Sequence, residues 1–181
     1  MKAQVLAALI GLTLAASHAK AAQPDAKLLA AVKACDKDAR PLLERLVAID
    51  TGTGDAEGLN AVGAIYAAEL KALGGEVKAV APASPAAGDN VVATFTGTGK
   101  GRILLISHMD TVFGRGDVAK RKPRWEGEHY VGPGAGDDKS GGVTAICALR
   151  ALKATGFKDF ARIAQMAVTP PLLSSPAPGP T

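Results

Sequence analysis

Aromatic residues make up only 4% of the 181 residues, and the chain has just two cysteines. Neither Cys35 nor Cys147 has a Cys or His neighbour at the spacing of a metal-binding pair, which argues against a zinc site built from cysteine. Each cysteine lies in a stretch with helical periodicity. A packed thiol is therefore the expected state of both, with a disulfide as the alternative in an exported protein.

The sequence also lacks a strong excess of charge. It has 21 Lys and Arg against 17 Asp and Glu, a formal net charge of +4. Residues 1–21 hold two lysines and no acid, so removing them leaves 19 basic against 17 acidic residues, or +2. The basic residues do not line one face with interleaved aromatics. Neither nucleic acid nor an anionic membrane is an expected partner.

No apolar run is long enough to span a bilayer, which needs about 20 residues. The run at 5–16 follows Lys2 and precedes Ala19-Lys20-Ala21, which offers small residues at the two positions that signal peptidase reads. A buried helix is the alternative, but the polar Gln23-Pro24-Asp25 linker argues against it. Residues 1–21 are therefore predicted to be a signal peptide, with a periplasmic or secreted protein that has no membrane contact after processing.

Residues 22–163 predict an α/β domain with helices packed on a mainly parallel sheet, since apolar periods of three to four residues alternate with short strand-like runs. The continuous run at 102–107 predicts a central strand buried on both faces. The remaining expected elements are helices over 28–47 (interrupted or restarted at Pro41), 59–73 (capped by Asp55 and ended by Gly74-Gly75) and 143–152 (closed near Gly156), with strands over 76–80 and 90–96 and a strand or hairpin arm over 125–131.

The end of the chain changes in composition. Five of the eleven prolines fall after residue 169, and no acid follows Asp159. Proline cannot continue a helix interior or a central strand. Residues 164–181 are therefore predicted to be an aberrant, Pro-rich and disordered tail.

A His-x-Asp pair closes the buried strand at 102–107. In open α/β sheets, functional groups gather beyond the carboxyl ends of the strands. His108 and Asp110 lie two residues apart and would point to the same side of an extended chain. A metal-binding histidine needs its other ring nitrogen held by an acceptor, often a carboxylate. We therefore expect His108 as a metal ligand and Asp110 as the group that orients it, although a surface histidine is the commoner role of such a pair.

The second candidate is Asp137-Asp138 at the start of a predicted helix, after a Gly-rich loop. Capping of the helix is the alternative role for the two carboxylates. A phosphate-binding loop is not supported, because Asp138 stands where the pattern requires glycine before the lysine. Two acids at this position suit a cation better than a phosphate.

Taken together, the two candidates resemble the co-catalytic zinc exopeptidases that include glutamate carboxypeptidase, aminoacylase, acetylornithine deacetylase and succinyl-diaminopimelate desuccinylase. The resemblance extends from about Pro41 to Arg162. It rests on the segments Ile49–Asp55, Ser107–Val112 and Tyr130–Lys139, of which the first favours the folate-cleaving glutamate carboxypeptidases.

The resemblance implies a role for each site residue. His108 would bind one of two zinc ions, Asp110 would hold the His108 ring, and Asp137 would bridge both ions. The Asp137–Asp138 peptide bond would be cis. The implied reaction is hydrolysis of an amide in a small peptide or a folate-like N-acyl amino acid, releasing a C-terminal amino acid that is expected to be glutamate. The full-length form would be a homodimer.

The resemblance also implies residues that the sequence does not provide. The family has a further strand after the helix, then a Glu-Glu pair that supplies the general base and a zinc ligand, later acidic and histidine ligands, and a lid domain that dimerises. We therefore expect a chain truncated before its later strands and inactive by itself. The alternatives are a non-catalytic remnant or small metal-binding domain, and a related amidohydrolase of the aminoacylase or deacetylase type.

Overall fold

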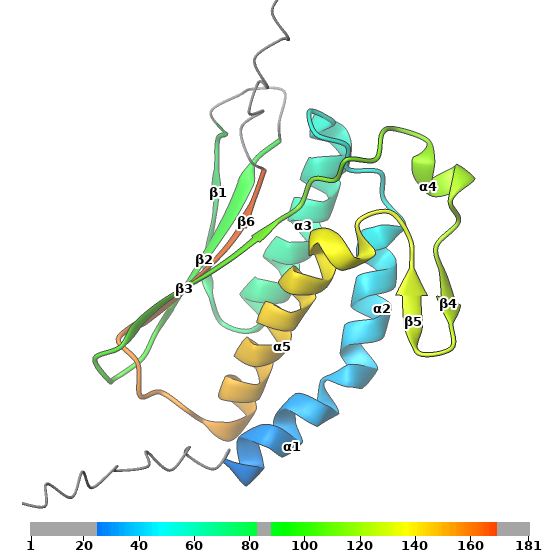
Figure 1. Ribbon diagram of the computed structural model, residues 1–181. Coiled ribbons are helices and arrows are strands. Elements are labelled where there is room, and N and C mark those ends of the chain that lie inside the picture. Colours follow the sequence, from blue (N-terminus) through cyan, green and yellow to red (C-terminus); the bar gives the residue numbers. More distant parts are fainter. Residues whose placement is uncertain (1–24, 83–87, 170–181) are drawn as a thin grey trace, which may run out of the picture.

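The computed structural model describes residues 25–82 and 88–169, which form a four-stranded sheet with its helices stacked on one side (Figure 1). The predicted signal peptide at 1–21 and residues 170–181 of the predicted tail lie outside the described residues. No helix within the described part of the chain combines the length and the apolarity needed to cross a membrane.

The sheet has the strand order β1-β2-β6-β3. β3 and β6 are parallel and are joined through the helix α5, whereas β1 with β2 and β2 with β6 are antiparallel. The α/β architecture is confirmed, and the described sheet is mixed, with one parallel pairing. The four strands are β1 (Glu76–Val80), β2 (Asn90–Thr96), β3 (Arg102–His108) and β6 (Arg162–Val168).

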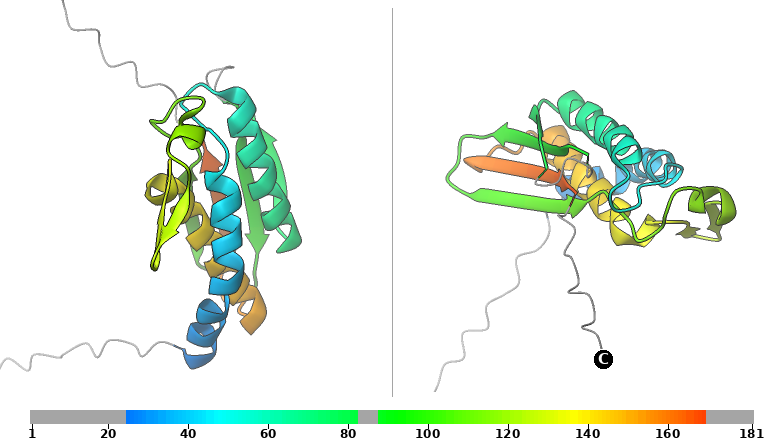
Figure 2. Two further views of the ribbon diagram at one scale, coloured as in Figure 1. Left: turned by 90° about the vertical axis from the view of Figure 1, so that its right-hand side faces the viewer. Right: turned by 90° about the horizontal axis from the view of Figure 1, so that it is seen from above.

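Two helices lie directly on the sheet and two more form an outer layer. α3 (Ala56–Ala72) packs against β1 and β2, while α5 (Ser140–Thr155) packs against β3. α1 (Ala26–Ala34) and α2 (Asp36–Val47) contact α5 from the side away from the sheet (Figure 2). The smaller elements are α4 (Asp117–Lys120), the predicted hairpin of β4 (Arg124–Glu126) and β5 (His129–Val131), and a helical turn, Ala135–Lys139, that leads into α5.

The helix ends largely follow the predictions. Asp55 caps α3 by accepting a hydrogen bond from the Gly58 amide, and Gly74 and Gly156 take the left-handed conformation after α3 and α5. The break in the first helical stretch was misplaced. It falls at Cys35, between α1 and α2, and Pro41 lies within α2.

β3 is not the central strand that its apolar run predicted. It lies at one edge of the described sheet, and Leu104 and Ile106 are 54% and 62% exposed. Their side of the sheet faces away from α5, and no described helix covers it. A continuous apolar run therefore correctly indicated a strand with two apolar faces but did not show how many elements cover them.

The predicted boundary after residue 163 does not match the strand that crosses it. β6 continues to Val168, and Ile163, Gln165 and Ala167 alternate inward toward the core. Thr169 is buried as well, and its amide donates to the side chain of Asn90. Residues 164–168 therefore belong to the sheet and Thr169 to the buried part of the chain, and the prolines begin only after them.

α5 and α3 pack closely at Gly142. A Cβ at this position would lie 2.2 Å from the Tyr66 hydroxyl oxygen, so only glycine fits. Tyr66 is fully buried, and its hydroxyl donates to the Lys139 carbonyl at 3.3 Å. The core around this contact also contains Leu46, Leu59, Val62, Leu70, Val91, Met109 and Ile146.

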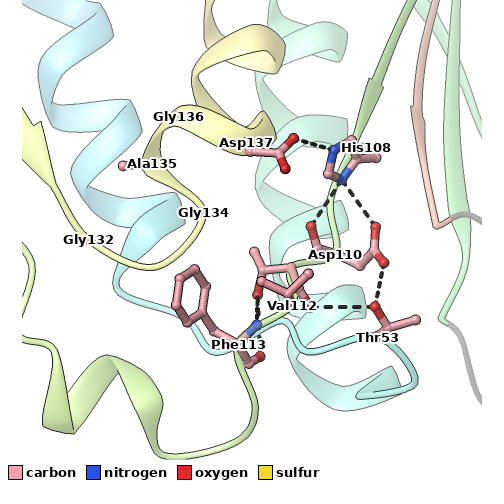
Figure 3. Close-up of a pocket in the computed structure, with 11 residues that line it drawn as sticks. Thr53, His108, Asp110, Val112, Phe113, Gly132, Gly134, Ala135, Gly136 and Asp137 are labelled. Atoms are coloured by element: carbon pink, nitrogen blue, oxygen red, sulfur yellow. Dashed lines mark hydrogen bonds and ion pairs between the residues drawn. The ribbon is translucent and has the colours of Figure 1, made fainter.

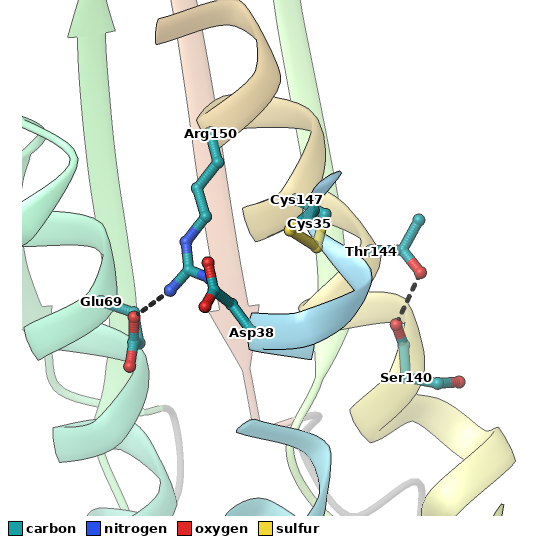
Figure 4. The surroundings of a disulfide bond; sticks show 7 residues. All are labelled: Cys35, Asp38, Glu69, Ser140, Thr144, Cys147 and Arg150. Atoms are coloured by element: carbon teal, nitrogen blue, oxygen red, sulfur yellow. Dashed lines mark hydrogen bonds and ion pairs between the residues drawn. A yellow bond between two sulfur atoms is a disulfide. The ribbon is translucent and has the colours of Figure 1, made fainter. Parts of the chain in front are cut away.

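Cys35 and Cys147 form a disulfide, so the expectation of packed thiols was wrong (Figure 4). The bond joins the α1–α2 junction to α5. Beside it, Arg150 forms ion pairs with Glu69 of α3 and Asp38 of α2, which link α5 to both of these helices. Helical periodicity placed each cysteine on a helix, but only the packing of α1 on α5 brings the two together.

The loop after α2 is tied to the loop after β3. The Thr111 amide donates to the Thr51 carbonyl at 2.7 Å, and the Asp50 carboxylate accepts hydrogen bonds from the amides of Gly116 and Val118. Partial burial raises the pKa of Asp50, but these two amide bonds and nearby positive charges lower it further, so that the pKa lies below its usual range.

Loss of the disulfide is expected to destabilise the chain by about 3–5 kcal/mol, because it closes a loop of more than 100 residues in the unfolded state. The comparison is urea unfolding of the unsubstituted chain with and without dithiothreitol, beside the Cys35→Ser/Cys147→Ser variant. The variant should match the reduced chain and should not respond to dithiothreitol. An unchanged unfolding midpoint on reduction would contradict this expectation.

Replacing Asp50 by alanine removes an ionised acceptor from two backbone amides, with an expected loss of about 2 kcal/mol at pH 7. Because the folded-state pKa is depressed, the stabilisation is complete above about pH 4 and is lost as the pH falls through the folded-state pKa. Urea unfolding at pH 7, 5 and 3.5 should therefore show the difference between Asp50→Ala and the unsubstituted chain shrink at the lowest pH. Glu128→Ala, at an exposed position in the β4–β5 turn, serves as the control and should change stability by less than about 0.5 kcal/mol. A difference that stayed constant across this pH range would contradict the argument.

Candidate functional site

The site lies at the carboxyl end of β3, where this strand meets the start of α5. His108 is the last residue of β3, and the Met109 amide donates to the Val168 carbonyl of β6 at 2.9 Å, which holds the strand end in place. The turn Ala135–Lys139 contacts β3 and brings the second acidic motif to the same edge. Two segments separated by about thirty residues thus meet at one point.

The His108 ring lies between two carboxylates (Figure 3). Its Nε2 is 2.9 Å from Asp137 Oδ1, and its Nδ1 is 3.2 Å from Asp110 Oδ1 and 3.0 Å from the Asp110 carbonyl oxygen. A carbonyl oxygen can only accept a hydrogen bond, so Nδ1 carries a proton. The structure brings together all three residues that the sequence singled out.

The charges around the imidazole favour its protonated form. Partial burial lowers the pKa of His108, but the hydrogen bond with Asp137 and the contacts with Asp110 more than offset this, so the pKa lies above its ordinary value. A site that attracts a proton in this way also attracts other cations.

The two adjacent acids have different surroundings. The Asp137 side chain is 89% exposed, whereas Asp138 turns inward and its Oδ2 accepts a hydrogen bond from the His108 amide at 3.3 Å. The peptide bond between them is cis, as the resemblance implied. Asp137 is therefore open to solvent while it contacts the His108 ring, and Asp138 fixes the backbone at the end of β3.

A cavity of about 320 Å³ opens beside these groups. His108, Asp110 and Asp137 form its polar side, and Val112 and Phe113 contribute apolar walls (Figure 3). Its floor includes the Gly-rich loop 132–136. Gly134 has a φ of +73°, and a Cβ on it would lie 2.4 Å from the Thr111 side chain, so a larger residue would push this loop out of place.

Lys139 neither pairs with the adjacent acids nor faces solvent. It is 1% exposed, and its Nζ donates to the Ile49 carbonyl at 2.9 Å. Burial lowers the pKa of Lys139 to about 8, partly offset by the negative charge of Asp50. The lysine thereby joins the start of α5 to the loop after α2.

Sequence reasoning missed Thr53 as part of the site. Its hydroxyl oxygen is 2.7 Å from Asp110 Oδ2, and it lines the cavity. Thr53 belongs to the segment Ile49–Asp55 that carried part of the resemblance, so the segment was found. Nothing in its spacing from Asp110, 57 residues away, indicated that the two side chains meet.

The donor groups fit a zinc ion in type but are few in number. An imidazole nitrogen and a carboxylate oxygen are zinc ligands of the usual kind, and His108 Nε2 and Asp137 Oδ1 are close enough to contact one cation. Within residues 25–82 and 88–169, no group of three or more His, Cys, Asp or Glu side chains is arranged to hold a metal ion. The described residues therefore supply two candidate ligands, His108 and Asp137.

Comparisons with known proteins agree with this arrangement. Residues 104–169 match peptidase family M20/M25/M40. The chain is 46% identical over 121 residues to Carboxypeptidase G2 of Pseudomonas sp. (strain RS-16), a match that covers 67% of this chain and 29% of that protein.

Solved structures of two peptidases have a similar fold. A tripeptidase from Staphylococcus aureus is 25% identical with a TM-score of 0.59, covering 74% of this chain and 36% of that one. Human carnosine dipeptidase 1 is 21% identical with a TM-score of 0.65, covering 79% and 34%. The chain thus spans between 29% and 36% of the length of these three relatives. The family match extends from β3 through α5 to β6, the elements that position His108, Asp110 and Asp137, and in this part the chain is similar to peptidase family M20/M25/M40.

Proposed function

We propose that this chain is part of a zinc-dependent carboxypeptidase that hydrolyses an amide bond and releases a C-terminal amino acid. The observation that carries the proposal is the distance of 2.9 Å between His108 Nε2 and Asp137 Oδ1, at the mouth of a cavity. Carboxypeptidase G2, with 46% identity over the matched region, supports the carboxypeptidase reaction.

Three residues have distinct roles in this proposal. His108 and Asp137 would hold zinc, of which a complete site would have two ions, and Asp110 accepts a hydrogen bond from Nδ1, so that Nε2 would be the nitrogen that binds the metal. When bound, zinc would supply Lewis-acid activation of a substrate carbonyl and of water. The apolar side chains of Val112 and Phe113 line one side of the cavity.

The substrate and location belong to the same proposal. The segment Ile49–Asp55, with its resemblance to the folate-cleaving enzymes, supports a small peptide or folate-like N-acyl amino acid as substrate and glutamate as product. The disulfide Cys35–Cys147 supports export to the periplasm or beyond, because such bonds persist in oxidising compartments. A homodimer of a longer form rests on the family resemblance alone.

The 181-residue chain is proposed to be inactive by itself. A catalytic zinc keeps about three protein ligands, and the described residues supply two. No described carboxylate beyond Asp110, Asp137 and Asp138 lines or borders the cavity as a general base. The sequence has no acid after Asp159, whereas the family resemblance implies a Glu-Glu pair after the strand that is β6 here.

Zinc binding tests the proposal directly. The metal-free, untagged chain is expected to bind Zn²⁺ in isothermal titration calorimetry, and the His108→Ala and Asp137→Ala variants should lose that binding because each removes a ligand. Asp110→Asn should weaken it by about 10- to 100-fold, as expected for a group that orients a ligand.

His129→Ala is the matched control, since His129 is exposed in β5 and lies outside the cavity. It should bind Zn²⁺ as the unsubstituted chain does. Equal binding by His108→Ala would show that zinc binds elsewhere and would overturn the assignment. Release of glutamate from a folate-like amide by the purified 181-residue chain would overturn the expected inactivity.

A further inference from the structure

Thr53 contacts the less exposed of the two carboxylates that face the His108 ring. Its hydroxyl oxygen lies 2.7 Å from Asp110 Oδ2, while Asp110 Oδ1 faces His108 Nδ1 at 3.2 Å. The Asp110 side chain is only 12% exposed, so few water molecules reach it. The two oxygens of this carboxylate thus face two different protein groups.

The position of Thr53 is set by the backbone on both sides of it. The Thr53 amide donates to the Thr111 carbonyl at 3.1 Å, the Thr111 amide donates to the Thr51 carbonyl at 2.7 Å, and Gly52 pairs with Thr111 in a parallel bridge. The hydroxyl is therefore supplied by a segment that is fixed to the residue directly after Asp110.

The hydroxyl has two acceptors within reach. The Thr111 carbonyl oxygen is 3.4 Å away, against 2.7 Å for Asp110 Oδ2. A hydrogen bond to an ionised carboxylate is shorter and stronger than one to a neutral carbonyl. The single hydroxyl proton therefore goes to Asp110.

We propose that Thr53 is a positioning residue, whose hydroxyl fixes the rotation of the Asp110 carboxylate and thereby the orientation and tautomer of His108. With Oδ2 bonded to Thr53, Oδ1 is turned toward Nδ1 and accepts a hydrogen bond from it. In the neutral ring this acceptor favours the proton on Nδ1, against Asp137, whose Oδ1 lies 2.9 Å from Nε2 and favours a proton there. The role of this tautomer in holding a metal rests on the proposed function. The contacts from Thr53 to Asp110 and from Asp110 to His108 do not depend on a metal.

The test uses nitrogen NMR of the histidine rings in the ¹⁵N-labelled, metal-free chain, at a pH where His108 is neutral. The unsubstituted chain is expected to hold a larger share of His108 as the Nδ1–H tautomer than a chain without the Thr53 hydroxyl. Thr53→Val keeps the branched shape but removes the hydroxyl, and should shift the tautomer ratio toward Nε2–H by about fivefold, the equivalent of one hydrogen bond. Thr53→Ser keeps the hydroxyl and should restore the original ratio.

His129 provides an internal control because it lies in β5, outside the cavity that His108 and Asp110 line. An unchanged His108 ratio in Thr53→Val would overturn the proposal. If Thr53→Val does not fold, as judged by its amide spectrum, Thr53→Ala replaces it. Failure of both to fold would also overturn the proposal, because the hydroxyl would then support the loop and not the orientation of His108.

A second readout separates this inference from the proposed function. Zn²⁺ titrated into the same samples should bind Thr53→Val about tenfold more weakly than the unsubstituted chain and Thr53→Ser. Absence of zinc binding in all three would count against the zinc site, while the tautomer ratios would still decide the role of Thr53.

Discussion

The close contact between α5 and α3 determines where the rest of the site lies. Tyr66 fills the space that a side chain at residue 142 would need, and its hydroxyl holds the Lys139 carbonyl one turn earlier. The first turn of α5 is thereby held against the core. Because α5 begins next to the carboxyl end of β3, Asp137 can contact His108 there.

The buried lysine at the start of α5 extends this constraint to the surrounding loops. Placing an ammonium group away from water is costly unless it is bonded, and Lys139 has one carbonyl partner, on Ile49, with Asp50 nearby. Asp50 in turn holds the amides after the loop that carries Phe113. Lys139, together with Asp50, therefore connects the turn Ala135–Lys139, the loop after α2 and the loop that carries Phe113.

Local chemistry and periodicity predicted most of the elements, because caps, glycines and apolar spacing act within a few residues. They also singled out His108, Asp110 and Asp137, which the structure brings together. What they did not predict depends on contacts between distant residues. Leu104 and Ile106 belong to an apolar run typical of a central strand, but this strand lies at an edge of the described sheet. Lys139 carries a charge, which is typical of surface residues, but it is buried. Cys35 and Cys147, like Thr53 and Asp110, meet only through tertiary packing, so no spacing rule could pair them.

The disulfide has a consequence for how the chain comes apart. Its two cysteines are 112 residues apart, and His108, Asp110 and Asp137 all lie between them. A single cut of the backbone anywhere in that interval leaves two fragments that remain one covalent molecule. The fragments separate on a gel only after reduction. Until then His108, Asp110 and Asp137 remain in one covalently linked molecule.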